Sequence, residues 1–194
     1  MDALRKEKKC YSYADYYTWN DNERWELIEG VPFAMSPAPS WFHQAIIGNI
    51  YNQLHNFLKG KPCRVLVAPV DVCLYGAGDN DKTVVQPDIL IVCDKSKLKG
   101  KYCNGAPDMV IEVLSPTSVK HDRIIKFQQY QQAGVHEYWI VDPDTKSVST
   151  HILNNGEYTI RVYFDSDNVP VHVLEGCSVD LTEVFDYEID IGLS

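Results

Sequence analysis

The chain is 194 residues long and carries 18 Lys and Arg against 27 Asp and Glu, a formal net charge of −9 at pH 7. Its length fits one domain of ordinary size, and its 45% hydrophobic and 23% charged residues are typical of a globular protein. These values exclude collagen-like, disordered and coiled-coil proteins. The negative charge also excludes a protein that holds nucleic acid by bulk attraction alone, so any such contact must be local.

No apolar stretch approaches the roughly 18 residues that a membrane-spanning helix requires, and the basic N-terminus is not followed by an apolar segment. We therefore expect a cytoplasmic protein. The cysteines show no CxxC spacing, and most lie in or beside apolar, strand-like runs. This pattern predicts reduced, mostly buried thiols rather than a zinc site or disulfides at Cys10, Cys63, Cys73, Cys93, Cys103 and Cys177.

The first part of the chain predicts a short helix, a hairpin and one long helix. Ser12 and Asp15 are spaced like a capping box ahead of an aromatic helical turn. Gly30 separates two short runs of alternating polar and apolar residues, which predict antiparallel strands. Over residues 40–59, large apolar side chains recur every three or four positions. This spacing predicts a long helix with one buried face.

Two runs rich in Val, Leu and Ile follow, over residues 64–74 and 84–93. A turn-forming Gly and Asp segment separates them, so both predict strands. Proline cannot donate a backbone hydrogen bond, so Pro69 and Pro87 indicate bulges or edges within these strands.

A βαβ crossover is predicted next. Residues 107–114 form a near-continuous apolar run that is typical of a strand buried on both faces. A helix over 122–133 ends at Gly134, and residues 137–142 predict another strand. This order predicts two parallel strands with the helix on one face of the sheet. In the tail, strand-like runs alternate with Asn-Gly and Asp-Asn turns, which predicts antiparallel strands followed by a short final helix.

Two carboxylates, Asp88 and Glu112, lie in the most apolar strands. A buried charge is costly unless it is paired or binds a metal. If the two strands are neighbours, both carboxylates can point to one end of the sheet, and Mg²⁺ is held by one or two carboxylates while keeping sites for water and phosphate. The pair predicts a phosphodiester hydrolysis site in outline. The alternative is a pair of strand-end carboxylates that reach solvent or cap loops.

Asp122, Lys126 and Tyr130 are four positions apart on the predicted helix, so they share one face. Lys126 could reach back over the end of the strand that carries Glu112 and stabilise negative charge at phosphorus, or position the attacking water. Alternatively, Lys126 forms a surface ion pair with Asp122. The residues by themselves leave both interpretations open.

Six segments of the chain together resemble the Uma-two family of restriction endonucleases, a branch of the PD-(D/E)XK nuclease superfamily. They are WELIEG, MSPAPSWFHQ, VQPDILIV, PDMVIEVLSPTS, D-x-x-x-K-x-x-x-Y and GVHEYWIVDP. The resemblance covers about residues 12–185. It implies an α/β, restriction-endonuclease-like fold with a mixed central sheet flanked by helices. One nuclease-like domain would span 1–194, with a core at about 40–141, an N-terminal extension over 1–39 and a C-terminal β extension over 142–194.

The resemblance also implies roles for individual residues. Asp88 matches the superfamily's metal-binding aspartate, and Glu112 matches the acidic residue of its E-x-K half-motif. The position of the half-motif lysine is occupied by Leu114, which carries no charge, so the lysine role is expected to move to Lys126 on the following helix. The backbone carbonyl of Val113 is expected to add a metal ligand.

Glu26 and His43 are two further candidates from the resemblance. Glu26 matches an acidic position of the family's early strand, where it would bind metal or orient water. The alternative is an outward-facing strand carboxylate. His43 stands in the family's S-x-x-H position, where it would contact phosphate or carry a proton near neutral pH. The alternative is a hydrogen-bonded histidine at a helix start.

Four lysines, Lys95, Lys97, Lys99 and Lys101, alternate in the loop between the two carboxylate-bearing strands. They could grip a phosphate backbone as a local basic rim, which predicts weak, salt-sensitive binding. A solvated surface run is the alternative.

Together these observations predict an endonuclease that uses Mg²⁺ or Mn²⁺ to hydrolyse phosphodiester bonds in DNA. Cleavage of a duplex needs two cuts, so we expect a homodimer, which the edge strands of the tail could build. One alternative is a catalytically inactive nucleic-acid-binding or regulatory protein on the same fold. Another is a protein whose small-molecule or protein partner is unrelated to phosphate chemistry.

Overall fold

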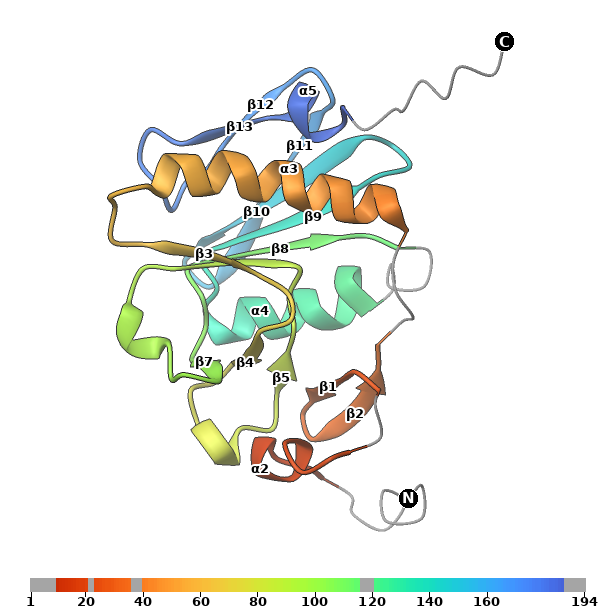
Figure 1. The fold of residues 1–194 in the computed structure, drawn as a ribbon, viewed down its shortest axis with the longest axis vertical. Coiled ribbons are helices and arrows are strands. Elements are labelled where there is room, and N and C mark those ends of the chain that lie inside the picture. The colour runs from red at the N-terminus through yellow and green to blue at the C-terminus, as the bar shows by residue number, and fades with distance from the viewer. Residues whose placement is uncertain (1–9, 21–22, 36–39, 116–120, 187–194) are drawn as a thin grey trace.

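The structure is a computed structural model that describes residues 10–20, 23–35, 40–115 and 121–186. Its two main sheets are separated by helix α4 (Phe127–Ala133), and helix α3 (Trp41–Leu58) covers the other face of the larger sheet (Figure 1). This mixed α/β architecture confirms the predicted fold class.

The larger sheet has six strands in the order β11-β10-β9-β8-β6-β3. Its strands are β3 (Arg64–Val67), β6 (Ile89–Val92), β8 (Met109–Val113), β9 (Glu137–Asp142), β10 (Ser147–Asn154) and β11 (Glu157–Phe164). Only β8 and β9 pair in parallel, and the helix between them lies on one face of the sheet. The predicted βαβ crossover is therefore confirmed.

The smaller sheet has five strands in the order β2-β1-β5-β4-β7. Its strands are β1 (Trp25–Ile28), β2 (Val31–Ala34), β4 (Asp71–Cys73), β5 (Val84–Val85) and β7 (Tyr102–Asn104). A short helix, α2 (Tyr13–Tyr16), packs beside this sheet, and its predicted capping box between Ser12 and Asp15 is present. Glu29 and Gly30, which join β1 to β2, both have positive φ, as a two-residue hairpin turn requires.

The prediction that residues 64–74 and 84–93 each form one strand, with a bulge or edge at its proline, is wrong. Each run splits into two strands near its proline, and the halves join different sheets: β3 and β6 the larger, β4 and β5 the smaller. Proline has no N–H to donate to a ladder, so pairing stops at Pro69 and Pro87 and the chain can pass from one sheet to the other. Asp88 consequently lies at a junction between the sheets.

The two helices that flank the larger sheet differ in regularity. The predicted helix over 40–59 is confirmed by α3, whose buried side chains include Ile46, Ile50 and Leu54. The predicted helix over 122–133 is confirmed, but its first part is a π-helical segment, η3 (His121–Lys126), which precedes α4. Such wider turns occur frequently at functional sites. The helix ends at Gly134, which adopts φ 83° as a left-handed cap.

The C-terminal part forms a small antiparallel pair, β12 (Asn168–Pro170) and β13 (Ser178–Asp180), followed by helix α5 (Leu181–Val184). Gln53 of α3 exchanges two hydrogen bonds with the backbone of Asp180, so this part is fixed against α3.

The prediction of six reduced cysteines is wrong for two of them. Cys63 and Cys93 form a disulfide. The antiparallel register of β3 and β6 pairs Arg64 with Val92, which brings the adjoining cysteines opposite each other. Among the four free cysteines, Cys73, Cys103 and Cys177 are buried as expected.

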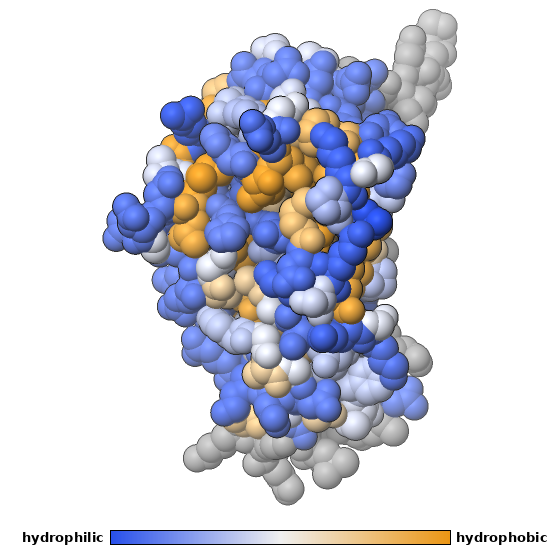
Figure 2. All heavy atoms as spheres, turned by 90° about the vertical axis from the view of Figure 1, so that its left-hand side faces the viewer, coloured by the Kyte–Doolittle hydropathy of each residue, from blue (hydrophilic) through white to orange (hydrophobic). Residues whose placement is uncertain are grey.

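In the described part of the chain, no helix is sufficiently long and apolar to cross a membrane. Figure 2 shows the face that lies on the left-hand side of Figure 1. Hydrophobic residues are visible mainly in its upper half, and its lower half, toward the smaller sheet, is largely hydrophilic. The cytoplasmic location stays a prediction.

Candidate active site

The two carboxylates singled out in the sequence lie on neighbouring strands. The antiparallel register of β6 and β8 pairs Ile89 with Ile111, so Asp88, just before β6, lies beside the end of β8. The contact is direct, because the backbone N–H of Val113 donates to Asp88 Oδ2 at 2.8 Å. Glu112 precedes Val113 in β8 and is 3% exposed. Asp88 and Glu112 thus occupy one end of the larger sheet, as predicted.

Lys126, at the end of η3, lies in a buried cage of carboxylates. Its Nζ lies 2.9 Å from Glu26 Oε1, 2.9 Å from Glu112 Oε1 and 3.4 Å from Asp122 Oδ1. The residue is only 4% exposed. A surface ion pair with Asp122 is therefore excluded, and so is an outward-facing Glu26, which is 3% exposed.

Burial and the neighbouring charges shift the pKa values of Glu112 and Lys126 in opposite directions. Burial raises the pKa of Glu112 well above its usual value, although the nearby ammonium opposes the shift. For Lys126, burial acts to lower the pKa, but Glu112 and the other two carboxylates outweigh it and hold the pKa well above its usual value. We conclude that the lysine stays charged. Three carboxylates around one ammonium also leave an excess of negative charge.

A second set of contacts joins His43, Val113 and Asp88. His43 Nε2 lies 2.8 Å from the carbonyl oxygen of Val113 and 3.5 Å from Asp88 Oδ2. A carbonyl oxygen only accepts, so Nε2 must carry a hydrogen. Burial raises the pKa of Asp88, and His43 counteracts the shift. His43 Nδ1 is buried and has no hydrogen-bond partner among the described residues, so this is not a fully hydrogen-bonded structural histidine.

Two further residues complete the site, although the sequence analysis assigned neither of them a role. The Tyr130 hydroxyl donates to Glu112 Oε1 at 2.8 Å, and the backbone N–H of Gln86 donates to Glu26 Oε1 at 2.9 Å. Tyr130 shares the helix face of Lys126 in the sequence, and that spacing could have indicated it. Gln86 gives no such signal, because its contribution is a backbone N–H placed by the sheet junction.

The side chain of Gln86 is itself held on several sides. Its Oε1 accepts from Arg24, and its Nε2 donates to the Tyr16 hydroxyl at 2.9 Å and to Asp71 Oδ1 at 2.8 Å. Glu26 therefore receives its hydrogen bond from a backbone that is fixed between α2 and the smaller sheet.

The sheet end carries oxygen groups of the kind that a small divalent cation takes as ligands. No group of three or more His, Cys, Asp or Glu side chains in the described part of the chain is arranged to enclose an ion. Mg²⁺ does not need such a cage, because one or two carboxylates suffice and water fills the remaining positions. Asp88, Glu112 and the Val113 carbonyl provide hard oxygen donors, and the excess negative charge favours a cation. One lone pair of that carbonyl already accepts from His43.

The structure thus places all six predicted site residues in one connected cluster: Glu26, His43, Asp88, Glu112, Val113 and Lys126. Their catalytic and metal-binding roles stay predictions. The four lysines of the 95–101 segment lie in different environments. Lys97 Nζ donates to the Ala106 carbonyl, and Lys101 Nζ donates to the Tyr17 hydroxyl. Lys95 and Lys99 are exposed.

The mixed sheet, the flanking helices and the carboxylates at the strand junction define a restriction-endonuclease-like α/β protein. The family model described as "Uma2: Putative restriction endonuclease" matches residues 13–182. This chain belongs to the Uma2 family.

Two similar proteins come from cyanobacteria. "Uncharacterized protein slr1290" of Synechocystis sp. is 25% identical over 159 residues, which cover 80% of this chain and 81% of that protein. A crystal structure from Anabaena variabilis, described as "a putative nuclease belonging to DUF820", superposes with a TM-score of 0.71 at 20% identity. The match covers 90% of this chain and 97% of that one. At this identity the structural likeness shows the fold alone.

Proposed function

We propose that this protein is a metal-dependent endonuclease that hydrolyses phosphodiester bonds in DNA. The observation that carries the proposal is the buried Lys126, held at 2.9 Å by Glu26 and by Glu112 at the sheet end that also carries Asp88. Burying an ammonium among carboxylates is expensive and is not needed for packing. Arrangements that shift several pKa values within one cluster are found preferentially at functional sites.

Asp88 and Glu112, with the Val113 carbonyl, would hold Mg²⁺ or Mn²⁺. The bound ion would polarise the phosphate and lower the pKa of its water. Lys126 would stabilise the negative charge that develops on the phosphate oxygens. Glu26, itself oriented by the Gln86 N–H, would position the lysine.

His43 would act as a positioning residue in this scheme. Its Nε2–H contacts both the Val113 carbonyl and Asp88, so it fixes two of the proposed oxygen donors relative to each other.

The test is plasmid nicking at low salt with Mg²⁺, Mn²⁺ or EDTA, comparing the wild type with Asp88→Asn. Asp144→Asn is the matched control, because Asp144 is exposed and lies outside the site. We expect metal-dependent nicking that falls by roughly 100-fold or more in Asp88→Asn and is unchanged in the control. Nicking that persists in EDTA, or that Asp88→Asn leaves intact, would contradict the proposal.

One observation favours a second candidate, a catalytically inactive nucleic-acid-binding or regulatory protein on the same fold. The three N–H donors of Lys126 face three carboxylates, so none is left over for a phosphate in this arrangement. Calorimetry with Mn²⁺ separates the two candidates. An enzyme should bind the ion and lose that binding in Asp88→Asn, whereas a protein that only binds nucleic acid has no need of it.

We also propose that the protein acts as a homodimer that pairs through β11. This strand is an edge of the larger sheet, and the exposed fractions of Ile160, Val162 and Phe164 are 54%, 54% and 57%. They alternate along the strand, so they form one apolar stripe. Antiparallel pairing of two β11 strands centred on Val162 would set Ile160 of each copy opposite Phe164 of the other. The stripe is therefore self-complementary, as a two-fold interface requires.

A further inference from the structure

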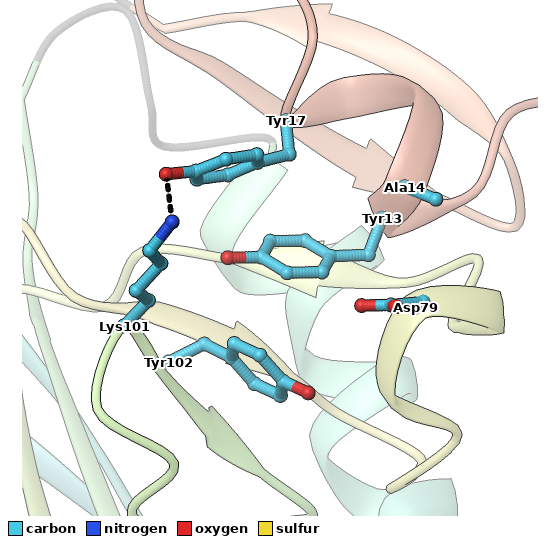
Figure 3. Close-up of a pocket in the computed structure, with 6 residues that line it drawn as sticks. All are labelled: Tyr13, Ala14, Tyr17, Asp79, Lys101 and Tyr102. Atoms are coloured by element: carbon cyan, nitrogen blue, oxygen red, sulfur yellow. Dashed lines mark hydrogen bonds between the residues drawn. The ribbon is translucent and has the colours of Figure 1, made fainter.

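A cavity of about 280 Å³ lies beside the smaller sheet and contains none of the carboxylate-site residues (Figure 3). It is formed by α2, the short 3-10 helix η1 (Gly78–Asn80) and the start of β7. Its lining residues are Tyr13, Ala14, Tyr17, Asp79, Lys101 and Tyr102. The family match and the active-site scheme assign no role to this cavity.

Three tyrosine rings line the cavity. The centroid of Tyr13 lies 4.8 Å from that of Tyr102 and 6.0 Å from that of Tyr17. Figure 3 shows the three rings arranged one above another, with Tyr13 in the middle. Tyr17 is 54% exposed, so its ring is accessible to a ligand. The Tyr13 ring is tilted by 59° to that of Tyr102 and by 48° to that of Tyr17, and Tyr13 is only 3% exposed, so it supports the outer rings from behind. An exposed aromatic ring such as that of Tyr17 is a surface on which an unpaired nucleobase can stack.

The polar groups of the cavity match the amino edge of a base and the phosphate of a nucleotide. Lys101 Nζ lies 4.3 Å from the centroid of the Tyr17 ring and donates to its hydroxyl, so the ammonium is held beside that ring (Figure 3). On the opposite side lies Asp79 (Figure 3). Within the described residues, neither the Asp79 carboxylate nor the Tyr102 hydroxyl has a hydrogen-bond partner. A carboxylate can accept from the exocyclic amino group of a base, and an ammonium can bind its phosphate.

We propose that this cavity holds one unpaired nucleobase of a nucleic-acid strand. The base lies against the exposed Tyr17 ring, its amino edge faces Asp79, and the adjoining phosphate binds Lys101. The inference rests on the proposed function, because it takes the strand to be the substrate or its flanking segment. The volume lies just below the range of about 300–1,000 Å³ for drug-sized ligand sites, which suits a single base.

A chain of hydrogen bonds fixes the cavity relative to the active site. The hydroxyls of Tyr13 and Tyr16 both donate to Asp71, at 3.4 and 3.0 Å. The Gln86 side chain joins Asp71 and Tyr16, and the Gln86 backbone holds Glu26, the partner of Lys126. A base bound in the cavity would therefore position its strand relative to Glu26 and Lys126, because the same hydrogen bonds hold the cavity and these active-site residues.

The test is fluorescence anisotropy of labelled single-stranded oligonucleotides in EDTA, so that no cleavage occurs. Tyr17→Ala should weaken binding by roughly tenfold, and Tyr17→Trp should retain it. Lys101→Ala should weaken binding and lower the salt slope by about one counterion. Lys59→Ala, which removes an exposed lysine on the other side of the fold, should change neither. Equal effects of Tyr17→Ala and Lys59→Ala would overturn the proposal.

Base preference tests the role given to Asp79. Oligo(dA) and oligo(dC), whose bases carry amino groups, should bind more tightly than oligo(dT), and Asp79→Ala should remove the difference. Equal binding of all three by the wild type would overturn this part. Competition with free dAMP tests the source of the base: a cavity that binds dAMP while the protein binds no oligonucleotide would overturn a strand as the ligand.

These outcomes are separable from those of the nuclease test. Nicking that depends on Asp88 together with binding that ignores Tyr17 would overturn the cavity alone. Binding that depends on Tyr17 without any nicking would support the cavity and overturn the nuclease.

Discussion

At the scale of single residues, the balance at Lys126 decides the character of the site. Its ammonium contacts three carboxylates, and the Tyr130 hydroxyl adds a donor to Glu112. Burial raises the pKa of Glu112 and of Tyr130, so the tyrosine remains a protonated donor. Each group in the cage depends on the others, because any one left unpaired would be a buried polar group without compensation.

Replacing Lys126 should therefore affect stability in a pH-dependent way. Lys126→Met leaves buried carboxylates without their cation, and we expect a loss of about 3–5 kcal/mol in the free energy of unfolding near pH 7. The folded-state pKa of Glu112 is raised above its unfolded value, so its protonated form is favoured by folding, and stability is lost as pH rises. Without the ammonium, which opposes this shift in the wild type, Glu112 is protonated more readily. The difference in unfolding free energy between wild type and Lys126→Met should therefore become smaller as pH falls toward 5. Urea unfolding at several pH values measures this, and a deficit independent of pH would contradict it.

At the scale of elements, Glu137 ties the C-terminal segment to β9. The residue is 0% exposed, its Oε1 accepts from Trp139 Nε1 at 2.7 Å, and its Oε2 accepts from the Val173 N–H at 2.9 Å. Burial raises the pKa of Glu137 to about 7, although the two N–H donors oppose the shift. The strand and the segment that packs on it are therefore joined through a titratable group.

The pH dependence of this contact has a definite sign. The folded-state pKa lies above the unfolded value, so the stability from Glu137 is fully present below about pH 4.5 and is lost as pH rises through about 7. We expect the unfolding free energy to fall between pH 5 and pH 8, with a share of at most about 3 kcal/mol from this group. Glu137→Gln should flatten the slope, and the exposed Glu157→Gln should not. Identical slopes in the two variants would refute the assignment.

At the scale of the whole molecule, β11 offers a surface for self-association. Val162→Lys places a charge at the centre of the apolar stripe and should convert the dimer to a monomer. Asn52→Lys, on the exposed face of α3, adds the same charge elsewhere and should leave the dimer intact. Sedimentation velocity over a range of protein concentrations reports the change. A wild type that sediments as a monomer at all concentrations would rule out the β11 interface.

Elements whose signals are local can be predicted from the amino-acid order alone. The spacing of Ile46, Ile50 and Leu54 predicts α3, and the apolar run ending at Leu114 predicts β8. The capping box at Ser12 specifies the first helix in the same way. Periodicity, caps and turn residues act over a few positions, so they can be read without knowing the rest of the fold. The resemblance of the motifs then indicated the family.

Contacts between distant residues, in contrast, depend on how the whole chain folds. The register of β3 and β6 brings Cys63 to Cys93, and the junction between the two sheets brings the Gln86 backbone to Glu26. The burial that turns Lys126 from a surface residue into the centre of a cage depends on β1, β8 and η3 together. Such contacts join positions far apart in the chain, and their geometry depends on how the sheets pack. No local pattern encodes that packing, because it results from the burial of all apolar faces at once.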